Sequence, residues 1–200
     1  MELKKLKKLK KLKKLKKLKK LKKLKELKKL KTNMKEIRLR ALEPEDLDIL
    51  YRIENDRELW QVGVTNVPYS RYVLHDYIAH SSNDIYADRQ LRLMIEEAEG
   101  DVVGIIDLVN FDPRHLRAEV GVVIRPVYRR QGFATAAVSK LCRYAVDVIH
   151  LRQLYVVTAQ DNEAAIRLFR KAGFSHSVVL REWLSDGQNR HDAVLLQKFF

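Results

Sequence analysis

The chain has 200 residues and a formal charge of +14, but the charge is concentrated at one end. Residues 1–31 hold eighteen lysines against two acidic residues, which leaves 22 basic and 24 acidic residues in the remainder. The body of the chain is therefore not expected to bind a specific nucleic acid. The single cysteine, Cys142, excludes an internal disulfide framework and fits a reducing cytoplasm. No apolar run is long enough to span a bilayer.

The first 33 residues form a lysine–leucine tail. Leucine recurs at every third position from Leu3 to Leu30. Because three residues advance an α-helix by about 300°, these leucines circle the helix and form no lasting apolar stripe. We expect residues 1–33 to be a solvated, partly helical extension or an addition to the natural chain; the alternative is weak binding to anionic surfaces. The domain is expected over residues 34–200, a length that can bury a core.

The first half of the body begins with a strand signal. Ile37, Leu39 and Ala41 alternate with arginines, which predicts a half-buried strand. Two helices are expected next, the first opened by Pro44 and the second capped by Ser70. Three strands then follow, over residues 91–95, 102–109 and 119–124.

The second half begins with a change of apolar period after Gly132, which predicts a long helix. A short buried strand over residues 154–158 precedes a second helix, which starts at Asn162 and stops at Gly173. Asp186-Gly187 predicts a hairpin turn between the last two strands, residues 177–183 and 193–198. The expected order is β-α-α-β-β-β-α-β-α-β-β, a single α/β domain with a mixed sheet flanked by helices.

A tight turn joins the strand that ends at Ile124 to the long helix, with the sequence Arg129-Arg130-Gln131-Gly132-Phe133-Ala134. A helix N-terminus offers unpaired N–H groups at a positive dipole end, which suits a pyrophosphate. Gly132 lets a ligand approach the backbone because it has no Cβ, and the two arginines add positive charge. Turns of this kind also occur without a ligand, so the hexapeptide alone leaves both interpretations open.

A second motif begins thirty positions after Gly132, with the sequence Asn162-Glu163-Ala164-Ala165-Ile166-Arg167-Leu168-Phe169-Arg170-Lys171-Ala172-Gly173-Phe174. In this order and at this distance, the two motifs resemble the acyl-CoA signatures of the GCN5-related N-acetyltransferase (GNAT) family. The resemblance implies an enzyme that moves an acetyl group from the co-substrate acetyl-CoA to an amine. It also implies which residues hold acetyl-CoA: Val122, Ile124, Arg129, Arg130, Gln131, Gly132, Phe133, Ala134, Asn162 and Phe169. The alternative role of Asn162 is a plain helix cap, and the two roles are compatible.

Three further segments look like one branch of this family, the spermidine and diamine N-acetyltransferases and their ribosomal-protein N-terminal relatives. They are Arg117-Ala118-Glu119, Pro126-x-Tyr128 and Gly187-Gln188-x-Arg190. The branch implies a small-molecule amine as substrate, and a homo-oligomer is compatible with it.

Acetyl transfer needs a neutral amine, although alkylamines are mostly protonated at neutral pH. Glu119 is the expected general base; the alternative is a strand-end carboxylate that lies in solvent or pairs with Arg117. A strand amide at Val122 or Val123 is the expected oxyanion donor, because the family splays two strands there. The sequence does not choose between these two amides.

The leaving thiolate usually receives its proton from a tyrosine on the last helix of the family, but Phe169 stands at that position. Water or Tyr128 would then serve as the proton donor. The departure implies either a slower enzyme of the same kind or a non-catalytic acyl-CoA-binding module.

Three side chains after the first helix, Glu54, Asp56 and Trp60, are expected to join Glu119 at the amine site. The alternative is a solvated loop with a packed aromatic residue. A polyamine or diamine is the expected acceptor, and a protein N-terminus or an aminoglycoside-like amine is the runner-up. The histidines show no metal-ligand spacing, and no metal is expected.

Overall fold

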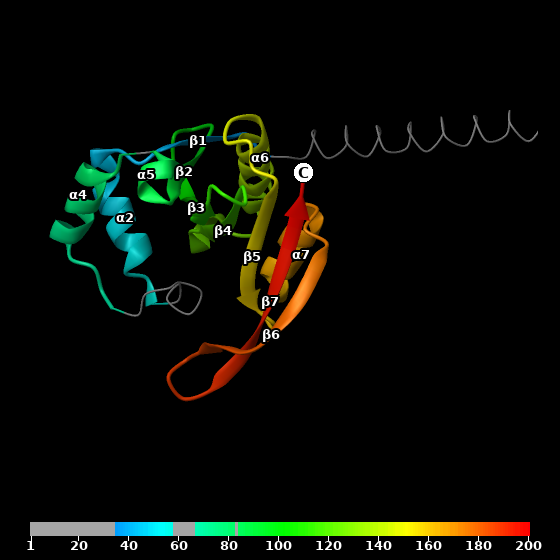
Figure 1. The fold of residues 1–200 in the computed structure, drawn as a ribbon. Coiled ribbons are helices and arrows are strands. Elements are labelled where there is room, and N and C mark those ends of the chain that lie inside the picture. The colour runs from blue at the N-terminus through cyan, green and yellow to red at the C-terminus, as the bar shows by residue number, and fades with distance from the viewer. Residues whose placement is uncertain (1–34, 58–66, 83) are drawn as a thin grey trace, which may run out of the picture. The chain divides into compact units, whose positions relative to one another are not determined.

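The computed structural model describes residues 35–57, 67–82 and 84–200, and one seven-stranded sheet organises them (Figure 1). The strands follow the order β1-β2-β3-β4-β5-β7-β6. The elements, in chain order, are β1 (Ile37–Ala41), η1 (Pro44–Asp46), α2 (Leu47–Glu54), α4 (Arg71–His80), α5 (Ile85–Asp88), β2 (Leu91–Glu97), β3 (Val102–Asp112), β4 (Arg117–Ile124), η2 (Pro126–Tyr128), α6 (Phe133–Asp147), β5 (Gln153–Ala159), α7 (Glu163–Lys171), β6 (His176–Ser185) and β7 (Arg190–Phe199).

The predicted order of strands and helices is confirmed, together with the local signals behind it. The Ser70 hydroxyl caps α4 by accepting a hydrogen bond from the Val73 amide. Gly173 follows α7 with φ 93°, the left-handed conformation expected of a helix-ending glycine. Asp186 accepts hydrogen bonds from the amides of Gln188 and Asn189, which closes the β6–β7 turn. The short elements η1, α5 and η2 are additions to the predicted order.

Helices cover both faces of the sheet. One apolar cluster lies between the sheet and the helices α2 and α4; it consists of Leu42, Leu50, Ile53, Leu74, Met94 and Ile105. Ile95 and Ile106, next along the same strands, are also fully buried. Because neighbouring strand residues face opposite sides of a sheet, these two point to the other face, where α6 packs on β3 and β4.

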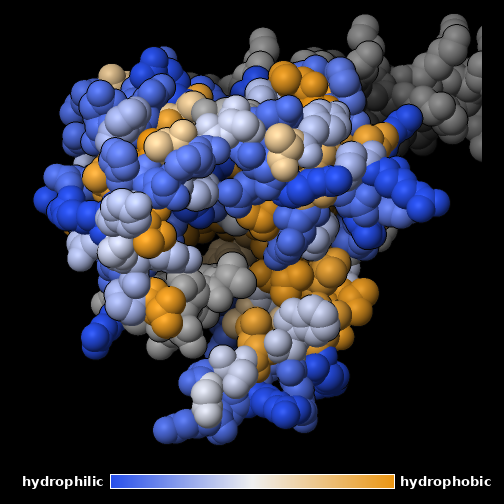
Figure 2. Space-filling view, turned by 60° about the vertical axis from the view of Figure 1, so that its left-hand side comes forward, coloured by the Kyte–Doolittle hydropathy of each residue, from blue (hydrophilic) through white to orange (hydrophobic). Residues whose placement is uncertain are grey.

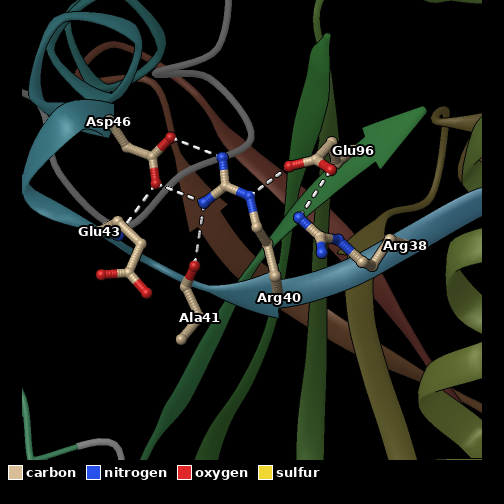
Figure 3. Close-up of polar contacts among 6 residues, drawn as sticks. All are labelled: Arg38, Arg40, Ala41, Glu43, Asp46 and Glu96. Atoms are coloured by element: carbon tan, nitrogen blue, oxygen red, sulfur yellow. Dashed lines mark hydrogen bonds and ion pairs between the residues drawn. The ribbon is translucent and has the colours of Figure 1, made fainter. Parts of the chain in front are cut away.

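An ionic group joins the first strand to the first helical segment (Figure 3). The Arg40 guanidinium donates to both carboxylate oxygens of Asp46, at 2.6 and 2.8 Å, and to Glu96 on β2 at 2.5 Å. The Glu43 amide also donates to Asp46, which is 5% exposed. Burial raises the pKa of Asp46, but the hydrogen bonds from Arg40 and Glu43 outweigh it and leave the pKa below its ordinary value.

The sheet divides between β4 and β5. These parallel strands pair only from Arg117–Gln153 to Glu119–Tyr155. Beyond that point β4 continues along β3 as far as Ile124, and β5 continues along β7 as far as Ala159. The two strands therefore separate after Glu119, and each leaves one edge without a strand partner.

Candidate active site

A pocket of about 500 Å³ opens where β4 and β5 separate. Figure 2 shows a hollow on this face, with apolar side chains gathered beside it. Its walls come from α2, α4, α7 and the strands β2 to β5. The lining residues that carry polar or aromatic side chains are Glu54, Tyr69, Tyr77, Gln90, Arg92, Asp107, Glu119, Thr158, Asn162 and Phe169. The pocket thus brings together several predicted site residues that are distant in sequence.

Glu119 lies at the point where the strands part and lines the pocket. Its carboxylate accepts a hydrogen bond of 2.8 Å from the Asn110 side chain. The pKa of the neighbouring Tyr155 is raised by burial and by the charge of Glu119. The ion pair of Arg117 is with Asp112, at 3.3 Å. Glu119 is therefore held by Asn110 at the pocket wall, and the alternative pairing with Arg117 is not what the structure has.

The backbone of β4 presents a defined set of amides to the gap. The Arg125 amide donates to the Val103 carbonyl of β3 at 2.9 Å. Amides alternate in direction along an antiparallel strand, so those of Val123 and Gly121 also point to β3. The amides of Val122 and Ile124 then point away from β3, toward the separated edge.

The facing edge of β5 follows by the same alternation. The Gln160 amide donates to the Asp192 carbonyl next to β7 at 3.0 Å. Residues of the opposite parity, such as Val157, therefore direct their backbone groups toward β4. The gap between the strands thus offers hydrogen-bonding backbone on both sides, which suits an extended chain that contains amides.

The loop from Arg129 to Gly132 leads from η2 into α6. Gly132 is the N-cap of the helix with φ 92°, and Arg130 is also left-handed with φ 61°. The Ala136 amide makes the first helical bond, to the Gly132 carbonyl. Within the described residues, the amides of Gln131 to Ala134 have no hydrogen-bond acceptor. They leave unpaired N–H groups at a helix N-terminus, an arrangement that can hold an anion.

An ionic group lies on the side of the pocket near α2 and α4. The Arg92 guanidinium donates to both oxygens of Asp107, each at 3.0 Å, and to Glu54 at 2.5 Å. It also lies 5.6 Å from the centre of the Tyr77 ring. Burial lowers the pKa of Arg92, but the neighbouring carboxylates outweigh this and raise it. Counting Glu119, the pocket lining carries three carboxylates and one guanidinium, a surplus of negative charge.

Comparison with known proteins agrees with this geometry. Residues 36–175 match the family described as Acetyltransferase (GNAT) domain. The chain belongs to the GNAT family. A spermidine N(1)-acetyltransferase of Escherichia coli is 31% identical over 160 residues, which cover 78% of this chain and 82% of that protein. The chain is accordingly an acetyl-CoA-dependent N-acetyltransferase.

One further relative and one solved structure are also similar to this chain. An N-alpha-acetyltransferase of Sulfurisphaera tokodaii is 25% identical, covering 78% of this chain and 91% of that protein. A crystal structure of spermidine N-acetyltransferase from Vibrio cholerae in complex with CoA and spermine superimposes with a TM-score of 0.72. That match has 24% identity and covers 82% of this chain and 95% of the other, so it supports the GNAT fold.

The second GNAT motif lies on α7, against the gap. The Asn162 side chain accepts a hydrogen bond of 3.1 Å from the Ala165 amide, so it caps the helix while it lines the pocket. Phe169 also lines the pocket but is only 2% exposed, and its ring packs edge-on against Phe174 at 5.1 Å. The pocket wall formed by α7 therefore carries an apolar ring at Phe169.

The structure does not bring Tyr128 into the pocket lining. Its hydroxyl donates to Asp101 at 3.0 Å, and its ring packs against Phe133. The hydrogen bond to Asp101, together with desolvation, raises the pKa of Tyr128. A tyrosine held in this way is poorly placed to protonate a thiolate in the gap.

The predicted acceptor residues divide into three cases. Glu54 lines the pocket and is bound by Arg92. Asp56 is half-buried and is not among the lining residues. Trp60 lies outside the described residues. Cys142 is buried in α6.

Three residues of the pocket were not predicted from the sequence: Arg92, Asp107 and Tyr77. Asp107 carried a usable signal, since it is the one charged residue inside the apolar run Val102–Val109.

In the described parts of the chain, no cluster of His, Cys, Asp and Glu is arranged to hold a metal ion. Nor does any helix there have both the length and the apolar character needed to cross a membrane.

Proposed function

We propose that this enzyme acetylates a primary amine of a polyamine or diamine, and that the amine attacks acetyl-CoA directly within a ternary complex. The observation that carries this proposal is the single pocket that joins the β4–β5 gap to a negatively charged wall. Acetyl-CoA would enter from the gap and a cationic amine from the carboxylate side. The likeness to spermidine acetyltransferases supports the same acceptor class.

Acetyl-CoA would be held at two places along β4 and α6. The amides of Gln131 to Ala134 suit its pyrophosphate, and Arg129 and Arg130 add positive charge there. The amide-bearing arm would run between the strands, where Val122 and Ile124 on β4 face Val157 on β5. Asn162 lies beside this path. In this way the thioester would reach the point where Glu119 and the gap meet.

Glu119 would accept the proton of the attacking ammonium, directly or through water. Asn110 holds its carboxylate at the wall by the 2.8 Å hydrogen bond. The Val122 amide is the better oxyanion donor of the two considered, because strand alternation turns the Val123 amide toward β3. Such a donor contributes about 3–4 kcal/mol to the transition state.

The leaving thiolate would take its proton from water. Phe169 has no acidic proton, and Tyr128 is bound to Asp101 outside the pocket lining. A thiol has a pKa near 8.5, so the thiolate is a tolerable leaving group without a dedicated acid. The result is an active enzyme that lacks the rate contribution of that acid.

A thiol-release assay tests the proposal with acetyl-CoA and a panel of acceptors: spermidine, spermine, 1,3-diaminopropane and peptides with unblocked N-termini. We expect CoA release with the polyamines and diamines above the rate without amine. Release with the peptides alone would favour a protein N-terminus as acceptor, as the Sulfurisphaera relative would suggest. Release with none of them, while acetyl-CoA still binds, would reject the proposal.

A further inference from the structure

A row of three residues crosses the pocket floor at the level of Asp107. Strand pairing places Arg92 of β2 opposite Asp107 of β3, and Asp107 opposite Gly121 of β4. All three line the pocket. Glu119 lies two residues before Gly121, so alternation puts it on the same face of the sheet. The floor therefore has Glu119 at one end, the Arg92-bound carboxylates at the other and Gly121 between them.

Gly121 is the only member of this row without a side chain. A Cβ placed there would lie 3.6 Å from the Asp107 Cβ and 3.8 Å from Asp107 Oδ2, which are ordinary contact distances. The backbone at Gly121 is not left-handed, so the strand itself does not require glycine. A larger side chain would extend from that point over the Asp107 carboxylate. The missing side chain thus keeps Asp107 open to the pocket.

We infer that Gly121 determines acceptor selectivity, because it opens a second cation subsite at Asp107 and Glu54 for an amine whose reacting end lies at Glu119. This inference rests on the proposed function and deepens it, because it assigns a place in the pocket to the second cationic group of the diamine or polyamine. One ammonium would lose its proton to Glu119, and the other would remain charged beside the two carboxylates.

Charge and partial burial both support a second ammonium at this position. Arg92 brings one positive charge to the two carboxylates that it binds, and the pocket lining as a whole carries three carboxylates and this one guanidinium. The Asp107 and Glu54 side chains are each 18% exposed, and partial burial limits screening by solvent.

The test compares two acceptors that differ in one nitrogen, 1,3-diaminopropane and propylamine. The protein variants are Gly121→Leu, which covers Asp107, and Gly121→Ala, which adds only a methyl group at an ordinary distance. Asp107→Asn removes the charge with the shape retained. The readouts are kcat/KM for each amine, KM for acetyl-CoA and the melting temperature.

We expect the unmodified enzyme to prefer the diamine by about tenfold or more, as one charge-assisted hydrogen bond provides. Gly121→Leu and Asp107→Asn should remove most of this preference through a loss on the diamine alone. Gly121→Ala should retain most of it. KM for acetyl-CoA should stay unchanged in all three variants. A Gly121→Leu variant that keeps the full preference would overturn the inference.

Two other outcomes test the second cation subsite and the proposed acetyl transfer independently of each other. Equal use of both amines by the unmodified enzyme would overturn the second subsite and leave acetyl transfer intact. If no amine is acetylated, the proposed function fails, and calorimetric titration of 1,3-diaminopropane in the presence of CoA decides the subsite. Tighter binding to the unmodified protein than to Gly121→Leu would support it, and equal binding would overturn it.

Discussion

Glu119 is the last residue of β4 that pairs with β5, and the Asn110 side chain fixes its carboxylate there. The carboxylate thereby stands where the amine and the thioester would meet. Position matters here as much as acidity, because a general base must come within hydrogen-bond reach of the proton that it removes. Asn110 has φ 51° at an irregular point of β3, so local backbone geometry aims its side chain at Glu119.

Replacement of Glu119 should slow acetyl transfer and leave the binding of acetyl-CoA unchanged. We expect Glu119→Gln to lower kcat/KM for the amine by about 10²–10⁴-fold, with KM for acetyl-CoA unchanged. The control is Glu163→Gln, because Glu163 is exposed on α7 and pairs with Arg167. Steady-state kinetics on both variants check this, and full activity of Glu119→Gln would assign the base to another group.

A second prediction for a single residue concerns Phe169. Since its ring lines the pocket, Phe169→Tyr should supply the missing acid and raise kcat by about 10²-fold, the low end of general-acid effects. Phe174→Tyr is the control, because Phe174 packs against Phe169 without lining the pocket. An unchanged kcat in Phe169→Tyr would mean that thiolate protonation does not limit the rate.

At the scale of elements, the backbone conformation of the turn into α6 is expected to affect the binding of acetyl-CoA. Gly132 has φ 92° as the helix N-cap, and Gly100 has a similar φ of 97° in the β2–β3 turn. Alanine at either site costs about 1–2 kcal/mol of stability, because a Cβ disfavours the left-handed region.

Only one of these two glycines lies at the predicted pyrophosphate site. Gly132→Ala should raise KM for acetyl-CoA by about tenfold, the loss of roughly one hydrogen bond to a charged group. Gly100→Ala should leave KM unchanged at a matched loss of melting temperature. Equal KM values in the two variants would argue against phosphate binding at the start of α6.

The docking of β1 on η1 depends on Asp46, which gives a pH-dependent prediction. The folded pKa of Asp46 lies below its ordinary value of 3.8, so its contribution to stability is complete above that pH and is lost as the pH falls through the folded pKa. Asp46→Asn should lower the free energy of unfolding at neutral pH by about 1–3 kcal/mol.

Denaturant unfolding at a series of pH values checks this prediction. The difference between Asp46→Asn and the unmodified protein should narrow as the pH drops below 3.8. Asp48→Asn is the matched control, since Asp48 forms an exposed pair with Arg71 and should change stability by only about 0–1 kcal/mol. If the difference in the free energy of unfolding between the two proteins stays constant with pH, ionised Asp46 is not the source of the stabilisation.

The sequence predicted those helix ends and turns whose stabilising contacts are local in the chain. Ser70, Gly173 and Asp186-Gly187 act on backbone groups within four residues, so the sequence carries the whole interaction. The Arg92–Asp107–Glu54 group is different, because its members lie on β2, β3 and α2 and meet only after folding. The choice of Val122 over Val123 likewise needs the β3–β4 register, which residue types do not reveal.

At the scale of the whole molecule, the strongly basic tail and the nearly neutral body are expected to act independently. The residues that line the described site lie between positions 53 and 169. Deletion of residues 1–33 should therefore leave acetyl-CoA affinity and kcat unchanged. Calorimetric titration of the shortened protein measures this, and a tenfold weaker affinity would show that the tail takes part in the site.

The co-crystal structure with CoA tests the central assignment most directly. We expect the diphosphate on the amides of Gln131 to Ala134 and the pantetheine arm between β4 and β5. The sulfur should then lie near the Val122 amide and Glu119. CoA bound with its diphosphate elsewhere, or with the β4–β5 gap empty at saturation, would contradict it.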